Sequence, residues 1–167
     1  MKNLDELFNQ AKNICTSLNI PISNNISIKY NGRIRKCWGY CRLQNNQYEI
    51  DIMRLLGEDD TISSDTVISI VLHELLHTCP NCMNHGKVWK SYKKLIENNY
   101  DYKIYTKCNA KDLHIKPRYI VKCRKCGNKQ KYVTRPRNVK YICMNCGSTK
   151  MKCIHKDLNG KELIWKN

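Results

Sequence analysis

The sequence predicts an α+β fold in which helices pack on a small antiparallel sheet, followed by a small β module organised around a metal ion. Three observations lead to this fold class: segments with helical periodicity, segments of alternating apolar and polar residues, and two C-x-x-C pairs near the end of the chain. The 167 residues suffice for one moderate domain and one small module. We expect these over residues 1–105 and 117–155, with a connector over 106–116 and a last strand or tail over 156–167.

The first expected element is an amphipathic helix over residues 3–19. Its apolar side chains recur three and four positions apart, which places them on one face of a helix. Pro21 follows the last of these positions and is typical of a helix end. The apolar residues are Leu4, Leu7, Phe8, Ala11, Ile14, Cys15 and Leu18.

A small sheet is expected next, with strands over residues 26–30, 33–43 and 47–52. The first of these segments alternates between apolar and polar side chains, as a half-buried strand does. Asn31-Gly32 is a strong signal for a two-residue hairpin turn, and Asn45-Asn46 provides a second turn. The expected arrangement is therefore an antiparallel meander.

Two further helices complete the first domain. Ser63 is a suitable N-cap, and Asp65 adds a negative charge to the first turn. The run from 67 to 72 is nearly all apolar, so this helix is expected to be buried on most sides. It ends before Pro80, and apolar residues at helical spacing predict another helix over 87–98.

The buried helix carries the motif His73-Glu74-Leu75-Leu76-His77. Residues four apart project from the same face of a helix, so His73 and His77 can both bind one Zn²⁺. Glu74 is placed beside them to hold a water molecule at the metal and take its proton. Two histidines and a glutamate on a buried helix need polar partners, which argues against a merely structural role. We therefore predict a catalytic zinc site with Glu74 as its catalytic residue.

A catalytic zinc ion usually has three protein ligands and one open position. His85 is the favoured third ligand, because a turn after the buried helix can bring it back to the metal. The alternative is Glu97 on the next helix, which would make a site of two histidines and one glutamate. Cys79 and Cys82 are near in sequence, but we expect them to shape the loop that presents His85 and not to act in catalysis.

A second metal site is predicted at Cys123, Cys126, Cys143 and Cys146. A glycine follows each C-x-x-C pair, which permits a tight turn with the backbone close to sulfur. The 16 residues between the pairs are typical of a two-knuckle zinc ribbon. Four thiolates make a closed site, so this zinc would be structural and would replace the core that so small a module cannot build. Cys153 and His155 are alternative ligands that fit the pattern less well.

The positive charge of the chain is concentrated in its second part. Residues 106–167 contain 17 lysines and arginines against 3 acidic residues, whereas residues 1–105 contain 13 against 11. A module this basic favours nucleic acid over an anionic membrane surface, because it lacks an amphipathic basic helix. The expected partner is DNA, single- or double-stranded, bound through phosphate contacts that are largely independent of sequence. The expected contact residues are Arg124, Lys125, Lys129, Lys131, Arg135, Arg137 and Lys140, with Tyr132 and Tyr141 as candidates for base stacking.

The cysteine content favours metal binding in a reducing compartment. The 11 cysteines are odd in number, and the first residues of the chain lack the apolar core of a secretion signal. Both observations argue against a disulfide framework. No stretch approaches the roughly 18 apolar residues of a membrane span, and a cytoplasmic location is expected.

The motifs together resemble the SprT-like metalloprotease family, which includes the Spartan DNA–protein crosslink proteases. The resemblance rests on the histidine motif followed by His85-Gly86-Lys87-Val88-Trp89, on the upstream segment Cys37-Trp38-Gly39-Tyr40-Cys41-Arg42, and on the four-cysteine tail, which is similar to the zinc ribbon of bacterial members. It covers residues from about 5 to 150. It implies a fold similar to minimal gluzincins, catalytic zinc on His73, His77 and His85, Glu74 as general base, and proteolysis of DNA-associated proteins in the cytosol.

Two other functions stay open at this point. One is a non-catalytic nucleic-acid-binding protein in which both zinc ions are structural. The other is a metalloprotease whose basic tail recruits acidic proteins or RNA. Zinc stoichiometry and stimulation of cleavage by DNA distinguish the enzyme from the pure binding protein.

Overall fold

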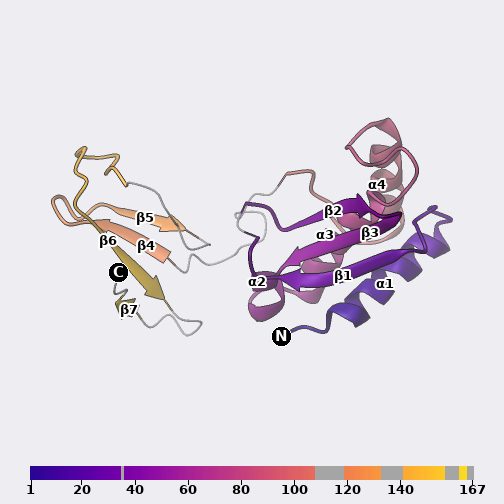
Figure 1. The fold of residues 1–167 in the computed structure, drawn as a ribbon, viewed down its shortest axis with the longest axis horizontal. Helices are drawn as coiled ribbons and strands as arrows, with labels where there is room; N and C mark the ends of the chain where they lie inside the picture. Colours follow the sequence, from indigo (N-terminus) through magenta and orange to yellow (C-terminus); the bar gives the residue numbers. More distant parts are fainter. Residues whose placement is uncertain (35, 108–118, 133–140, 157–161, 165–167) are drawn as a thin grey trace. The chain divides into compact units, whose positions relative to one another are not determined.

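The computed structural model describes residues 1–34, 36–107, 119–132, 141–156 and 162–164. The chain divides into two compact units, Met1–Asn109 and Ala110–Asn167, which we call the N-terminal unit and the C-terminal unit (Figure 1). Most of the expected connector, residues 108–116, lies outside the described part of the chain. Each unit has its own sheet, and each is described by itself.

The N-terminal unit contains the three long helices that the sequence predicts. Helix α1 spans Leu4–Ser17 and begins at Asn3, whose side chain accepts hydrogen bonds from the first-turn backbone. Helix α3 spans Ser64–Leu76 and begins at Ser63, which accepts from the Thr66 backbone N–H at 3.1 Å. Helix α4 spans Lys87–Asn99. A short helix that was not expected, α2, spans Arg54–Glu58.

The sheet of this unit has three strands in the order β1-β3-β2 (Figure 1). They are β1 (Ile26–Asn31), β2 (Gly39–Gln44) and β3 (Gln47–Met53). Strands β2 and β3 form the predicted antiparallel hairpin, in which Asn45 and Asn46 have φ values of 48° and 59°. Two successive positive φ values are what a two-residue turn between twisted strands requires, and asparagine tolerates them.

The predicted hairpin at Asn31-Gly32 is wrong, and the sheet is mixed rather than antiparallel. Strand β1 pairs in parallel with β3 and not with β2, and β2 begins only at Gly39. The physical reason is the position of β3, whose Ile50 and Ile52 are almost completely buried. The observed order places this most apolar strand in the centre with a partner on each edge, whereas the meander would have left it at an edge.

The two faces of the sheet have different characters. Helix α1 packs on β1 and α3, and α3 packs on β2 and β3, so that α1 and α3 cover one face (Figure 1). Ile50 and Ile52 point to this face, together with the β2 residues paired with them. Side chains alternate along a strand, so Asp51 and its neighbours Lys29 and Arg42 belong to the opposite face.

The C-terminal unit is an antiparallel sheet in the order β5-β4-β6-β7. Its strands are β4 (Tyr119–Cys123), β5 (Lys129–Tyr132), β6 (Met151–Lys156) and β7 (Glu162–Ile164). Strand β6 was not expected. The sequence over 139–142 is also strand-like, but residues 139–140 lie outside the described residues and 141–142 are not in a strand. In the described part of the chain, none of the helices is long and apolar enough to span a bilayer.

Replacing Gly57 by alanine tests the packing of α2 against β1. A Cβ atom at Gly57 would lie 2.5 Å from the Tyr30 ring carbon Cζ and 2.7 Å from its hydroxyl oxygen. Alanine normally stabilises a helix by about 1 kcal/mol relative to glycine, but this overlap should destabilise the protein by about 1–3 kcal/mol instead. Chemical denaturation measures the change. Gly32→Ala is the matched control, since its Cβ would meet only Arg54 Cδ at 3.6 Å. A Gly57→Ala protein as stable as the native one would contradict the packing.

Candidate metal centres and active site

Helix α3 places His73, Glu74 and His77 at its C-terminal end. The Nε2 atoms of His73 and His77 are 3.3 Å apart, as expected for side chains one helical turn apart that point to a common position. His77 is the C-cap that directly follows Leu76, and its backbone still has helical geometry. The ends of the two imidazoles therefore face the same point, and the next turn of chain starts directly beside it.

The loop between α3 and α4 brings His85 to the same point. Its Nε2 atom lies 3.0 Å from that of His73, and the three histidines offer ligand atoms within 4.8 Å of one another. A zinc ion with bonds of about 2.0–2.1 Å in tetrahedral geometry holds its ligand nitrogens about 3.3–3.4 Å apart. The number, chemistry and spacing of these nitrogens fit zinc, and the described residues supply three ligands to it, which leaves a fourth position open among them.

Of the two residues considered as third ligand, the structure brings His85 and not Glu97 to the histidine pair. Glu97 Oε1 accepts a hydrogen bond from the Ile104 backbone N–H at 2.8 Å, and Oε2 forms an ion pair with Lys93. Both carboxylate oxygens are therefore engaged on α4 and the segment that follows it. Glu97 has a structural role at the end of that helix.

The orientation of His77 is set by the loop that contains the first C-x-x-C pair. Its Nδ1 atom is 2.7 Å from the backbone carbonyl of Cys82, and a carbonyl can only accept, so Nδ1 carries the proton. The lone pair is thereby left on Nε2, which faces the other histidines. Asn81, with φ at 59°, makes the turn that aims this carbonyl. The loop therefore contacts the histidine site through a backbone carbonyl. The thiol of Cys79 in the same loop is buried, which raises its pKa to about 12.

Trp89 forms the floor of the histidine cluster, a role that helical periodicity alone did not reveal. It is fully buried, and its ring centroid lies 4.5 Å from His85, 4.9 Å from His73 and 5.7 Å from His77. Burial, followed by the neighbouring imidazoles, lowers the pKa of His73 to about 3. A histidine with so low a pKa is neutral at physiological pH, which is the protonation state that binds a metal.

Glu74 directly follows His73 on α3 and is buried, with only 4 % of the residue exposed. Burial raises the pKa of Glu74 to about 8. Gly39 at the start of β2 provides the space, because a Cβ there would lie 3.0 Å from Glu74 Oε1. Cys41, two residues along β2, points to the same face, and its thiol pKa is raised to about 12 by burial and then by Glu74. The Gly39 backbone thus packs directly against the side chain of Glu74 on α3.

The C-terminal unit brings together the four predicted ribbon cysteines. Cys123 and Cys146 have sulfur atoms 3.6 Å apart, and those of Cys126 and Cys143 are 3.5 Å apart. A tetrahedral zinc–thiolate site holds its sulfurs about 3.8 Å apart, so this cluster also fits zinc. Gly127 and Gly147 have φ values of 75° and 66°, the left-handed turn that the glycines were expected to supply. A hydrogen bond from the Asn128 backbone lowers the pKa of the Cys126 thiol to about 6, which favours the thiolate.

The cations of this unit form a pattern that the sequence did not reveal. On one face of the sheet, Lys122 of β4 is directly opposite Lys129 of β5 and Lys152 of β6. Lys131 lies on the same face of β5. Lys122 and Lys152 were not among the expected contact residues, because only the strand register shows them to be neighbours. The predicted contacts Arg124 and Lys125 lie exposed in the first knuckle, whereas Arg135, Arg137 and Lys140 lie outside the described residues.

A helix that presents two histidines and a glutamate, with a third histidine from the following loop, is an arrangement typical of zinc-dependent metalloproteases. The model of one protein family, the SprT-like family, matches residues 3–114. The chain therefore belongs to the SprT-like family, which is generally a family of metalloproteases, and the family membership predicted from the sequence is confirmed over these residues. No curated protein matches the chain.

Replacing His85 by alanine tests the ligand set. We expect the zinc content of the purified protein, measured by elemental analysis, to fall by about one equivalent per chain, since two histidines alone hold zinc weakly. Glu97→Gln is the matched control and should keep its zinc, because Glu97 bonds elsewhere. Loss of zinc in the Glu97 variant together with full zinc in the His85 variant would contradict the geometry.

Proposed function

We propose that the protein is a zinc-dependent endopeptidase that cleaves DNA-associated proteins, including proteins crosslinked to DNA, and that its basic zinc ribbon tethers it to DNA. The observation that carries the enzymatic part is the convergence of three Nε2 atoms beside a buried glutamate. A structural zinc site is closed by four protein ligands, whereas this cluster offers three. This difference favours catalysis over the alternative of two structural zinc ions.

The residues around the histidines suit peptide hydrolysis. A zinc ion held there would polarise the carbonyl group of the scissile bond and make water more acidic. Glu74 would accept a proton from the attacking water and deliver it to the leaving nitrogen. Burial raises the pKa of Glu74, so its carboxylate, once ionised, is a stronger base than that of an exposed glutamate. Trp89 closes the site from below, and the Cys82 carbonyl keeps His77 in its ligating tautomer.

One face of the C-terminal sheet carries Lys122, Lys129, Lys131 and Lys152, and this lysine face supports the proposed DNA tether. Lys122, Lys129 and Lys152 lie on three adjacent strands, whose spacing is about 4.8 Å. Like charges directly opposite one another destabilise a sheet, so a polyanion that neutralises them would bind with a favourable change in energy. Contacts to phosphates do not read base sequence, and a tether raises the local concentration of any protein bound nearby. We place this activity in the cytoplasm, whose reducing conditions keep the ribbon cysteines free of disulfides and able to bind a metal.

Glu74→Gln tests the catalytic role. The amide keeps the size of the side chain but cannot accept the proton, so cleavage of a protein crosslinked to DNA should fall by about 10²–10⁴-fold. Electrophoresis of the crosslinked substrate over time measures the rate. Zinc content should remain that of the native protein, which controls for loss of the metal. Undiminished cleavage by this variant would remove Glu74 from the mechanism.

The salt dependence of DNA binding tests the tether. We expect the affinity for DNA, measured by fluorescence anisotropy, to fall steeply as salt rises from about 50 to 200 mM, because cations on phosphates release counterions. Replacing Lys122 and Lys152 together by glutamine should weaken binding and reduce the slope of log affinity against log salt by about 1–2. Binding that ignores salt would reject the phosphate contacts.

A further inference from the structure

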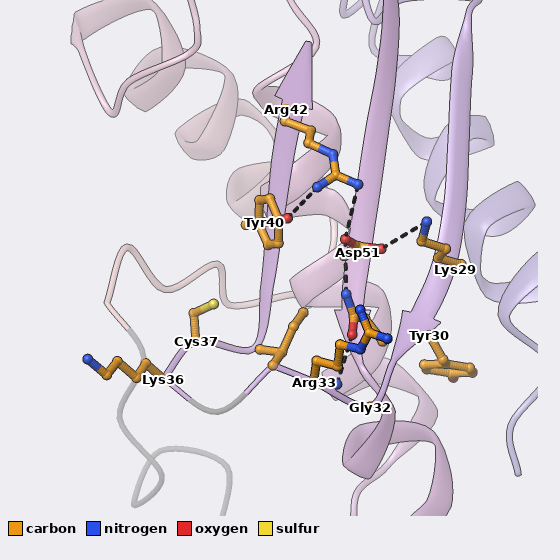
Figure 2. Close-up of a pocket in the computed structure, with 11 residues that line it drawn as sticks. Lys29, Tyr30, Gly32, Arg33, Lys36, Cys37, Tyr40, Arg42 and Asp51 are labelled. Atoms are coloured by element: carbon orange, nitrogen blue, oxygen red, sulfur yellow. Dashed lines mark hydrogen bonds and ion pairs between the residues drawn. The ribbon is translucent and has the colours of Figure 1, made fainter. Parts of the chain in front are cut away.

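The N-terminal unit has a second candidate site on the face of its sheet that α1 and α3 leave uncovered. A cavity of about 960 Å³ opens there, bordered by β1, β2, β3 and the connection between β1 and β2. Figure 2 shows its side chains in front of the strands, with the helices behind. Gly39, which packs on Glu74, belongs to the other face, so this cavity is separate from the histidine site.

Cations outnumber acids around this cavity. Its cationic lining residues are Lys29, Arg33, Lys36 and Arg42, and its acidic lining residue is Asp51. The Asp51 side chain is only 2 % exposed and lies 3.8 Å from Lys29 and 3.7 Å from Arg42 (Figure 2). Arg42 also donates a hydrogen bond of 2.6 Å to Glu49 of β3, so the two acids together hold Lys29 and Arg42 over the sheet. Arg33 and Lys36 are exposed on the connection and have no ion pair with any described residue. The cavity therefore keeps a net positive charge at its open side.

An exposed aromatic ring lies among these cations. Tyr40 is 38 % exposed, and its hydroxyl accepts a hydrogen bond from Arg42 Nη1 at 2.7 Å. The Arg42 guanidinium carbon is 5.5 Å from the centre of the ring, which fixes the ring beside the cavity (Figure 2). Exposed aromatic rings beside a positively charged groove are the two features by which proteins bind single-stranded nucleic acids, through base stacking and phosphate contacts.

We propose that this cavity binds a segment of single-stranded nucleic acid, with phosphates on Arg33 and Lys36 and a base against Tyr40. The inference rests on the proposed function, since it gives the proteolytic unit a contact of its own with the polymer that the ribbon is proposed to bind. The cations are spread over two strands and a connection rather than converging on one point, which suits an extended backbone better than a small phosphate. An acidic peptide would use the cations but gain nothing from the exposed ring.

The experiment uses the full-length, zinc-loaded protein and a short labelled single-stranded oligonucleotide of mixed sequence. Arg33→Gln combined with Lys36→Gln should weaken binding about tenfold at low salt and lower the salt slope by about 1.4, which corresponds to two phosphate contacts on a single strand. The matched control is Lys94→Gln combined with Lys107→Gln, two exposed cations of the same unit outside the cavity, and it should change neither quantity. Circular dichroism and zinc content verify that each variant is folded.

Tyr40 separates stacking from charge. Tyr40→Leu should weaken oligonucleotide binding roughly five- to hundredfold, because it removes a ring against which a base stacks. Tyr40→Phe keeps the ring and should bind nearly as well as the native protein. Equal affinities of the leucine and phenylalanine variants would overturn the inference.

The remaining outcomes distinguish this inference from the proposed function. If the native protein binds no DNA in a salt-dependent manner, the tether fails and the inference fails with it. If the native protein binds DNA and the cavity variants behave like the control pair, the inference alone is overturned. Displacement of the oligonucleotide by a mononucleotide at equal phosphate concentration would overturn it in favour of a small anion, and equal displacement by polyglutamate would do so in favour of an acidic protein.

Discussion

The convergence of three imidazole nitrogens on one point is the constraint on which the rest of the N-terminal unit depends. Two of them need one turn of a buried helix, and the third needs a loop that reverses within eight residues. Neutral imidazoles at such distances do not attract one another, and burial disfavours their protonated, charged form. Neighbouring groups therefore have to hold them in place: Trp89 beneath the rings and the Cys82 carbonyl on His77.

The two candidate zinc sites illustrate opposite solutions to metal binding. The histidine site is built on a core that α1, α3 and the sheet form without the metal. A zinc ion at this site can therefore keep its fourth coordination position open for chemistry. The cysteine site lies in a unit whose described residues include few buried apolar side chains. Its two knuckles repeat the same left-handed glycine turn at Gly127 and Gly147. In a unit of this kind the energy of metal binding is the energy of folding, which requires all four ligands to come from the protein.

Local signals made most of both sites predictable from sequence, and non-local pairing accounts for what was missed. The spacing of His73 and His77, the Ser63 cap and the Asn45-Asn46 turn each depend on a few consecutive residues. The partner of β1 depends on which strand occupies the centre of the sheet. The local turn signal at Asn31-Gly32 contains no information about that choice. The lysines of the C-terminal sheet can be recognised as neighbours only from the register of β4 with β6. Trp89 lies beneath the histidines only because α4 packs against α3.

Charge shows the same limit of local reading. The first 105 residues are nearly balanced in charge, which suggests a unit indifferent to polyanions. Folding separates the charges, however: Asp51 is buried beneath Lys29 and Arg42, while Arg33 and Lys36 remain exposed on the connection above it. A polyanion responds to the field at the surface it approaches, and a buried carboxylate that orients two cations does not cancel the exposed ones beside it. Net charge therefore describes the unit poorly, and the faces of its sheet determine what it can bind.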